Sequence, residues 1–253
     1  MNNKELAKKL DHAFQNVAAI PQISTIKPIT EQDGYDIQKE SMQKRYLRGE
    51  KMLGVHLGFT SEEKRKKLGV DQIILGQLTS SMLIQKGGVV LLEHFLRPRV
   101  QPELCFLVKK EISEEIKLEE IKEYIIGVAP ALQITDSRYQ GFKFHLPDVI
   151  ADNCFSAGFA IGNWSDLETP IENLTIKLQD GAETLLSGSS KTILGNPYQA
   201  VVEAAKLCQV LGLKLKRGSY ILAGAATASV ELQKEQHIKV EVEQLGHTSF
   251  VTR

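Results

Sequence analysis

The sequence lacks an excess of charge of either sign, since 31 Lys and Arg balance 31 Asp and Glu among its 253 residues. A balanced chain has no strong positive potential of the kind with which proteins bind nucleic acids or acidic membranes. We therefore expect a small molecule or another protein as its partner, and neither nucleic acid nor membrane.

Cysteine is scarce, and long apolar runs are missing. Cys105, Cys154 and Cys208 lie far apart and form neither a CxxC pair nor a Cys/His cluster of the kind that binds zinc. No run approaches the roughly 18 apolar residues of a transmembrane helix. The N-terminal stretch MNNKELAKKLDHAF is charged and amphipathic, unlike a secretory signal peptide. These features predict reduced thiols and a cytoplasmic location.

The composition, with 42% hydrophobic and 25% charged residues, is that of a globular chain long enough to bury one core. We expect a single domain over residues 1–253. Apolar residues recur at helical spacing between Leu6 and Val17, and Thr30 with Asp33 has the form of a helix capping box. Residues 1–50 are therefore predicted to form a small helical N-terminal lobe.

The rest of the chain, residues 51–253, has short apolar runs typical of β-strands. A hairpin turn is expected at Asp180-Gly181. Two helices interrupt the strands, one over 61–68 and one that Asn196 caps and Gly212 ends. The fold class is predicted as α+β, with a mostly β body. The predicted strands cover 52–59, 87–95, 100–108, 127–135, 174–179, 219–225, 226–232 and 237–245.

The stretch 127–159 closely resembles the 4-oxalocrotonate decarboxylase and 2-oxopent-4-enoate hydratase branch of the fumarylacetoacetate hydrolase superfamily, whose members read roughly ALE-I-DSRY-FK-LPDV-ADN here. Further segments, among them 57–82 and the stretch SGSSKTILGNPYQAVVEAAKLCQVLG, extend the resemblance over most of the chain. It implies that family's fold for the body. The matching residues are Ala131, Leu132, Asp136, Ser137, Arg138, Tyr139, Phe142, Lys143, Leu146, Pro147, Asp148, Val149, Ala151, Asp152 and Asn153.

The resemblance also implies a metal site, because the family holds Mg²⁺ or Mn²⁺ with a Glu-x-Glu pair and a third Glu. The corresponding residues here are Gln101, Glu103 and Gln133. Alternation along a strand places Gln101 and Glu103 on one face. An amide keeps an oxygen but loses the negative charge on which hard cations depend for affinity. We therefore expect this metal site to be weak or absent.

Other functional positions of the family are also changed. Its lysine before Gly-Leu-Thr aligns with His56, and its acid in the LTD-M turn is replaced within 78–82. An imidazole can donate to a developing enolate or carry a proton. We predict His56 and Glu103 as catalytic residues. The predicted substrate-binding residues are Gln101, Gln133, Lys143 and Ser81, and the candidate carboxylate anchors are Arg99, Lys143 and Lys191.

Structural interpretations remain open for several of these residues. His56 lies in an apolar run and can be a hydrogen-bonded core histidine, while Gln101 and Gln133 can satisfy each other's amides. We expect Asp136 and Arg138 to form a structural ion pair. Helix capping accounts for Asp148, Asp152 and Asn153, and Ser156 is a further candidate for the pocket wall.

Three functions are compatible with the residues. The first is a lyase that decarboxylates or hydrates a small unsaturated 2-oxo acid, where the family's metal stabilises the enolate. The second is a metal-independent isomerase, dehydratase or cyclase that uses His56 and Glu103. The third is a non-catalytic partner subunit of a hydratase, since fold alone does not fix function. A homo-oligomer is also expected.

Overall fold

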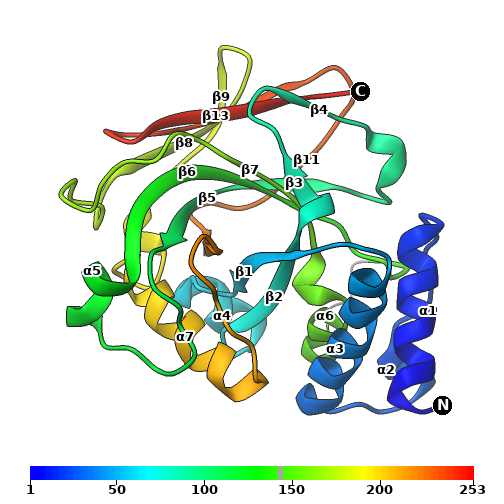
Figure 1. The fold of residues 1–253 in the computed structure, drawn as a ribbon. Coiled ribbons are helices and arrows are strands. Elements are labelled where there is room, and N and C mark those ends of the chain that lie inside the picture. The colour runs from blue at the N-terminus through cyan, green and yellow to red at the C-terminus, as the bar shows by residue number, and fades with distance from the viewer. Residues whose placement is uncertain (142–144) are drawn as a thin grey trace.

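The computed structural model describes residues 1–141 and 145–253. Two β-sheets form the body, and helices from the N-terminal part of the chain lie at one side of it (Figure 1). This arrangement confirms the predicted α+β class, with N-terminal helices and a mostly β body. Within the described residues, no helix combines the length and apolar character needed to cross a membrane.

The larger sheet has eight described strands in the order β2-β1-β10-β5-β6-β7-β3, with β11 paired to β5. β1 runs parallel to β10, and β3 runs parallel to β7. The long strands β5 and β6 form its centre and place residues that are distant in sequence side by side. The bounds are β1 Met52–Gly58, β2 Ile74–Thr79, β3 Leu83–Ile84, β5 Arg99–Val108, β6 Ile125–Thr135, β7 Ser156–Ile161, β10 Tyr220–Ala225 and β11 Val230–Glu231.

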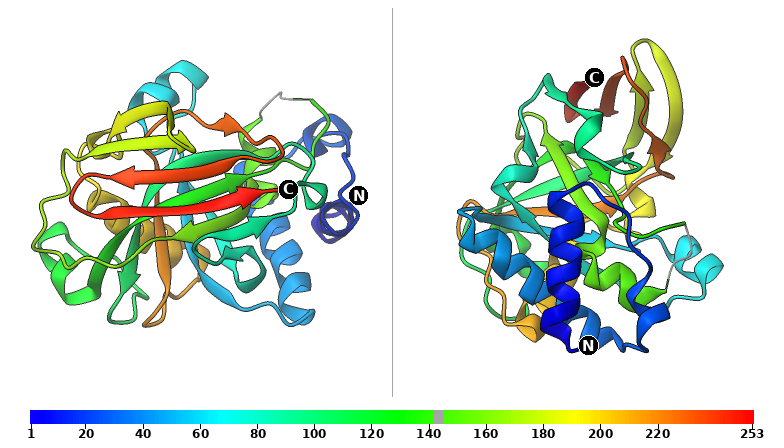
Figure 2. Two further views of the ribbon diagram at one scale, coloured as in Figure 1. Left: turned by 90° about the horizontal axis from the view of Figure 1, so that it is seen from above. Right: turned by 90° about the vertical axis from the view of Figure 1, so that its right-hand side faces the viewer.

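The smaller sheet has five described strands in the order β4-β13-β12-β8-β9 and lies across the β5–β7 region of the larger sheet (Figure 2, left). Apolar side chains such as Leu104, Phe106, Ile238 and Phe250 are buried in one cluster with the strands of both sheets. Their burial is the main stabilising contribution to this body. The bounds are β4 Gly88–Val90, β8 Thr175–Asp180, β9 Glu183–Ser189, β12 His237–Val242 and β13 Gly246–Thr252.

The N-terminal helices are α1 Asn3–Gln15, α2 Ile23–Ile26 and α3 Glu31–Leu47, and they lie beside α6 Leu146–Ala151 (Figure 2, right). The apolar face of α1 and Ile37 of α3 pack against Tyr139 and Ala151. The predicted capping box is confirmed, because the Thr30 hydroxyl accepts from Asp33 N–H and the Asp33 carboxylate accepts from Thr30 N–H.

The two helices predicted to interrupt the strands are present, one of them with a shifted start. α4 Glu62–Leu68 has Ser61 as its N-cap and Gly69 at its end, as expected. α7 is Gln199–Leu211 and ends at Gly212, but its N-cap is Tyr198 and not Asn196. Short helical segments complete the chain at α5 Ile121–Tyr124, η1 Ser80–Met82, η2 Leu92–His94, η3 Leu118–Glu120, η4 Asn153–Phe155 and η5 Ser190–Thr192.

Two predicted strands are shorter than expected, and four strands were missed. Residues 87–95 contain only β4 before a 3-10 turn, and residues 226–232 contain only β11. The apolar runs did not predict β2, β3, β7 and β13. The hairpin at Asp180-Gly181 is confirmed, since β8 and β9 pair across it and Gly181 has a φ of 56°.

Candidate functional site

Five polar side chains from four strands meet on one face of the larger sheet. His56 comes from β1, Gln101 and Glu103 from β5, Gln133 from β6, and Ser156 from the first position of β7. The pairing of β5 with β6 sets Gln101 directly opposite Gln133. The strand geometry therefore brings together four of the predicted site residues and Ser156.

The Glu103 carboxylate is fully buried, and each of its oxygens accepts a hydrogen bond. Oε2 accepts from the backbone N–H of Gly224 at 2.9 Å, and Oε1 accepts from Gln101 Nε2 at 2.9 Å. His56 Nε2 lies 3.4 Å from the same Oε1. Burial, followed by the charge of Glu103, raises the pKa of the neighbouring Cys105 thiol well above its usual value.

The two amides bond to each other, which confirms the structural alternative for this pair. Gln101 Nε2 donates to Gln133 Oε1 at 2.6 Å. Gln133 Nε2 in turn donates to Ser156 Oγ at 3.4 Å, and Ser156 Oγ lies 3.2 Å from His56 Nδ1. A continuous chain of polar contacts thus runs from Glu103 to the imidazole.

His56 is 2% exposed, so it belongs to the core, and it also borders a cavity. Its Nε2 has no hydrogen-bond partner among the described residues. Leaving a buried polar group unsatisfied costs about 1–3 kcal/mol. A ligand atom that accepts from this nitrogen would remove that cost.

A cavity of about 430 Å³ lies next to the cluster, and His56 and Gln101 form part of its wall. Apolar side chains, among them Phe59, Ile74 and Val149, form much of the remainder. A concave apolar pocket with a few convergent polar groups is the usual form of a small-molecule site. The cavity therefore marks the candidate active site.

Three cationic side chains also line this cavity, namely Lys64, Arg97 and Arg99. Lys64 Nζ donates to the Thr227 carbonyl at 3.0 Å, and burial lowers the pKa of Lys64 while the charge of Glu103 opposes that shift. Arg99 donates through Nε to Ser229 Oγ at 2.9 Å. The cavity thus offers positive charge to an anionic ligand.

The metal ligands that the family resemblance implies do not form a cage of acids here. Within residues 1–141 and 145–253, no group of three or more His, Cys, Asp or Glu side chains is placed to hold a metal ion. Of the three implied ligand positions, only Glu103 carries a carboxylate, and amides occupy the positions of Gln101 and Gln133.

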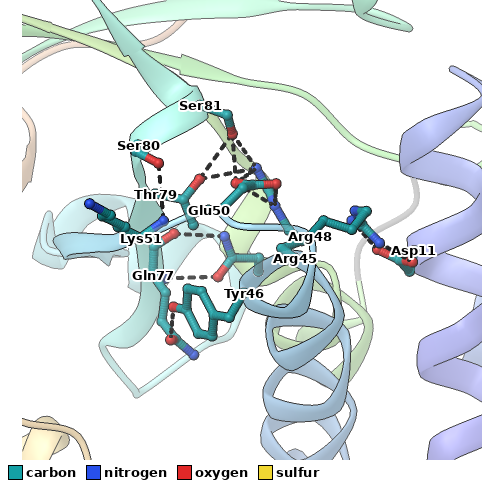
Figure 3. A network of polar contacts seen from close by, with 11 residues as sticks. Asp11, Arg45, Tyr46, Arg48, Glu50, Lys51, Gln77, Thr79, Ser80 and Ser81 are labelled. Atoms are coloured by element: carbon teal, nitrogen blue, oxygen red, sulfur yellow. Dashed lines mark hydrogen bonds and ion pairs between the residues drawn. The ribbon is translucent and has the colours of Figure 1, made fainter.

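The other predicted substrate ligands lie elsewhere. Ser81 Oγ donates to Glu50 Oε2 at 2.6 Å and accepts from Arg45 Nη2 at 3.0 Å, in a network between α3 and the end of β2 (Figure 3). Ser81 is not among the residues that line the cavity beside His56. Lys191 is exposed in η5 and also lies outside that lining. Lys143 falls outside the described residues.

The predicted ion pair between Asp136 and Arg138 is wrong, because Arg138 pairs with Asp152 instead. Arg138 Nε donates to Asp152 Oδ1 at 2.6 Å, and burial raises the pKa of Asp152 to about 6 although Arg138 opposes the shift. The Asp136 carboxylate instead accepts from the backbone N–H groups of Leu96 and Arg97. Asp136 thus supports the segment at Leu96 and Arg97 beside the cavity, and Asp152 supports the loop at Arg138.

The capping interpretation of the α6 segment is also wrong in detail. No side chain caps α6, and Asp148 accepts hydrogen bonds from the backbone and hydroxyl of Ser24. Asn153 binds both backbone groups of Gln77 in β2, donating at 2.9 Å and accepting at 2.7 Å. Asp148 and Asn153 therefore join separate segments of the chain and do not cap a helix.

Sequence reasoning missed Lys64, Arg97 and Gly224 as parts of the site. Lys64 lies within the segment 57–82 that resembles the family, and its place in that segment was a usable signal. No local pattern marks Gly224, because its role depends on a backbone N–H that meets Glu103 across two paired strands.

Comparison with known proteins agrees with this arrangement. Residues 54–251 match the family described as fumarylacetoacetate (FAA) hydrolase C-terminal. A 4-oxalocrotonate decarboxylase from Pseudomonas sp is 40% identical over 252 residues, which cover 100% of this chain and 98% of the relative. The 2-keto-4-pentenoate hydratase 2 of Dechloromonas aromatica (strain RCB) is 26% identical over 87% of this chain and 86% of its own.

Among solved structures, the 4-oxalocrotonate decarboxylase from Pseudomonas putida G7 complexed with magnesium and adipate superimposes with a TM-score of 0.95. The two sequences are 29% identical, and the match covers 99% of this chain and 97% of the other. The family match and these relatives lead to one conclusion. The chain belongs to the fumarylacetoacetate hydrolase family and is a lyase-like enzyme.

Proposed function

We propose that this enzyme cleaves or hydrates a small unsaturated 2-oxo acid, with decarboxylation as its first candidate reaction, and that its divalent-metal site is weak or lost. The observation that carries the second part is the 2.6 Å hydrogen bond from Gln101 Nε2 to Gln133 Oε1. The first part draws on the decarboxylase and hydratase relatives.

The amide cluster fits a divalent cation poorly. The Gln101 NH₂ group points at Glu103 Oε1 and Gln133 Oε1, so hydrogen atoms face the oxygens that would bind an ion. Charge adds to this misfit, because two unit charges about 4 Å apart attract with about 4 kcal/mol at an effective dielectric constant of about 20. A divalent ion facing two acids has several such unit-charge pairs, so replacing both acids by amides removes several times this attraction.

The cavity supports an anionic substrate of the proposed kind. Lys64, Arg97 and Arg99 supply positive charge to carboxylates, and the apolar wall accepts an unsaturated carbon chain. The guanidinium group of an arginine can bind a carboxylate through two N–H donors. The reacting 2-oxo group would then face His56 and Gln101 on the sheet side of the cavity.

Decarboxylation of such an acid breaks the bond to the departing carboxylate, and the electron pair passes through the conjugated system to the 2-oxo oxygen. The resulting enolate then takes a proton at carbon and regains the carbonyl. Both steps are faster when a fixed donor stabilises the enolate oxygen in a dry site. His56 borders the cavity 3.4 Å from Glu103 and supplies the hydrogen-bond donor to the enolate oxygen, while the proton that the carbon takes comes from solvent water.

The contact between His56 and Glu103 also supports a second candidate function. A histidine and a carboxylate 3.4 Å apart can move a proton between two carbons without a metal. An isomerase, dehydratase or cyclase acting on a related carbonyl compound would use the same pair. Product analysis separates the two candidates, because only decarboxylation releases carbon dioxide.

The proposal is tested by incubating the purified enzyme with 4-oxalocrotonate and, separately, with 2-keto-4-pentenoate. We expect turnover of one of them, little change on adding a chelator, and a loss of about 100-fold or more in kcat for His56→Ala. Gln209→Ala on the exposed side of α7 is the control and keeps wild-type turnover. Absence of turnover of both acids contradicts the lyase assignment, and abolition by chelator contradicts metal independence.

A further inference from the structure

The geometry points to a specific state of His56: the amides Gln101 and Gln133, acting through Ser156, hold the neutral imidazole with its proton on Nε2, as a hydrogen-bond donor for the enolate oxygen of the substrate. The nature of this substrate rests on the proposed function. The tautomer itself follows from the contacts within the cluster, and His56 acts while the other three residues position it.

The chain of contacts begins at Glu103, whose carboxylate can only accept hydrogen bonds. Because Gln101 contacts Glu103 Oε1 at 2.9 Å, Gln101 must turn its NH₂ group toward that oxygen. The two hydrogen atoms of this group then serve two acceptors, Glu103 Oε1 and the Gln133 side chain. The orientation of the first amide is thereby fixed.

The orientation of Gln133 follows from that of Gln101. Since Gln101 donates, Gln133 must present its carbonyl oxygen, and the observed distance is 2.6 Å. The NH₂ group of Gln133 therefore faces the opposite way and donates to Ser156 Oγ at 3.4 Å. Ser156 is thus an acceptor toward Gln133.

The direction of these hydrogen bonds also determines how Ser156 interacts with the imidazole of His56. Among the described residues, the only acceptor within hydrogen-bond distance of its hydroxyl is His56 Nδ1, at 3.2 Å. The hydroxyl proton therefore points at Nδ1, which must be the unprotonated nitrogen of a neutral ring. The ring proton is then on Nε2, which makes no hydrogen bond among the described residues, lies 3.4 Å from Glu103 Oε1 and belongs to a side chain that lines the cavity.

An acid in place of Gln133 would reverse this polarity. A carboxylate accepts from Ser156, and Ser156 Oγ then accepts from an Nδ1–H of the imidazole. The amide at this position accordingly turns His56 into an Nε2–H donor. A neutral imidazole donor can stabilise an enolate without giving up its proton, so it supplies part of the stabilisation that a metal gives elsewhere.

The tautomer is read by two-bond ¹⁵N–¹H NMR correlations of the histidine rings in the wild-type enzyme, and His56→Gln identifies the His56 signals by their loss. We expect a protonated Nε2 and a bare Nδ1. Addition of oxalate, which resembles the enolate of a 2-oxo acid, should move the Nε2–H proton downfield. A protonated Nδ1, alone or together with Nε2, overturns the inference.

Two variants test the positioning residues. Ser156→Ala removes the donor to Nδ1 and should give a mixture of both tautomers, while Gln133→Glu should move the proton to Nδ1. Gln209→Glu adds the same charge on the exposed side of α7 and should leave the His56 signals unchanged. If both site variants keep the wild-type pattern, the amide chain does not set the tautomer. The NMR readout needs no turnover, so it separates this failure from failure of the lyase proposal.

Discussion

Gln133 occupies the centre of the buried cluster because its amide both accepts and donates a hydrogen bond. A carboxylate at this position can only accept, and beside Glu103 it would add a second buried negative charge. The exchange of acid for amide therefore changes both the charge and the direction of the hydrogen bonds. At the scale of single residues, this exchange distinguishes the site from the acid set that the family resemblance implies.

Gly224 gives a stability prediction at the same scale. It has a φ of 97°, and a Cβ there would lie 2.0 Å from Thr60 Oγ1. Its N–H also donates to Glu103. A left-handed backbone alone costs an L residue about 1–2 kcal/mol, so Gly224→Ala should lower the free energy of unfolding by about 3 kcal/mol once the clash is added.

Urea denaturation measures this loss, and Gly218→Ala is the matched control. Gly218 has a similar φ of 87°, but a Cβ there meets nothing within 4 Å. The free energy of unfolding of this control should therefore fall only by the cost of the left-handed backbone, about 1–2 kcal/mol. Equal losses in the two variants would show that the close approach to Thr60 has no energetic weight.

Part of the site could be predicted from local sequence. Alternation along one strand predicted that Gln101 and Glu103 lie on one face. The hydrogen bond between the side-chain amides of Gln101 and Gln133 was expected as one of two alternatives. The position of Ser81 was not foreseen, because the turn after β2 faces Arg45 of α3, about 36 residues away in sequence. Contacts of this range leave no local pattern.

At the scale of elements, the cap of α3 gives a pH prediction. The backbone N–H of Thr30, followed by the side chains of Asn3 and Thr30, lowers the pKa of Asp33 from 3.8 to about 2. A carboxylate whose pKa is lower in the folded state stabilises the fold above its unfolded pKa, and this stabilisation disappears as pH falls through the folded value. Stability should therefore decline as pH drops from about 4 to about 2.

This prediction is checked by urea unfolding of the wild type and Asp33→Asn over that pH range. The variant should show a shallower decline, and a carboxyl NMR titration should place the Asp33 pKa near the lower value. Asp36→Asn removes the same charge from the exposed side of α3, outside the cap. A wild-type slope in Asp33→Asn would contradict the cap as the source of the effect.

Helix boundaries were more predictable than strand boundaries. Ser61 and Thr30 cap their helices through contacts that span three residues, so the sequence contains the whole signal. Asn196 instead accepts from Tyr198 N–H in a turn just before α7, which delays the helix by two residues. Strands such as β7 depend on distant partners, and their ends depend on where the pairing stops.

At the scale of the whole molecule, the N-terminal helices are tied to the sheet by a polar network (Figure 3). Arg45 of α3 forms an ion pair with Glu50 at 2.9 Å and donates to Thr79 Oγ1 at 3.1 Å, at the end of β2. Arg48 pairs with Asp11 of α1 at 2.7 Å. The network fixes the start of β1, the strand that carries His56.

The expected assembly with further copies or with a hydratase stays a prediction, as does the cytoplasmic location. Neither affects the arrangement of the cluster, because all five side chains come from strands of one sheet in one chain. The fold as a whole followed from the family resemblance and the apolar pattern together. The chemistry depends on three positions where the sequence departs from the resemblance, His56, Gln101 and Gln133.

The most direct measurement is a calorimetric titration of the enzyme with Mn²⁺. We expect no saturable binding by the wild type up to millimolar metal, and clear binding by the combined variant Gln101→Glu, Gln133→Glu and His56→Lys, in which the charge of the family's site is restored. Gln209→Glu should behave as the wild type. Tight, stoichiometric binding of Mn²⁺ by the wild-type enzyme, lost in Glu103→Gln, would contradict the account.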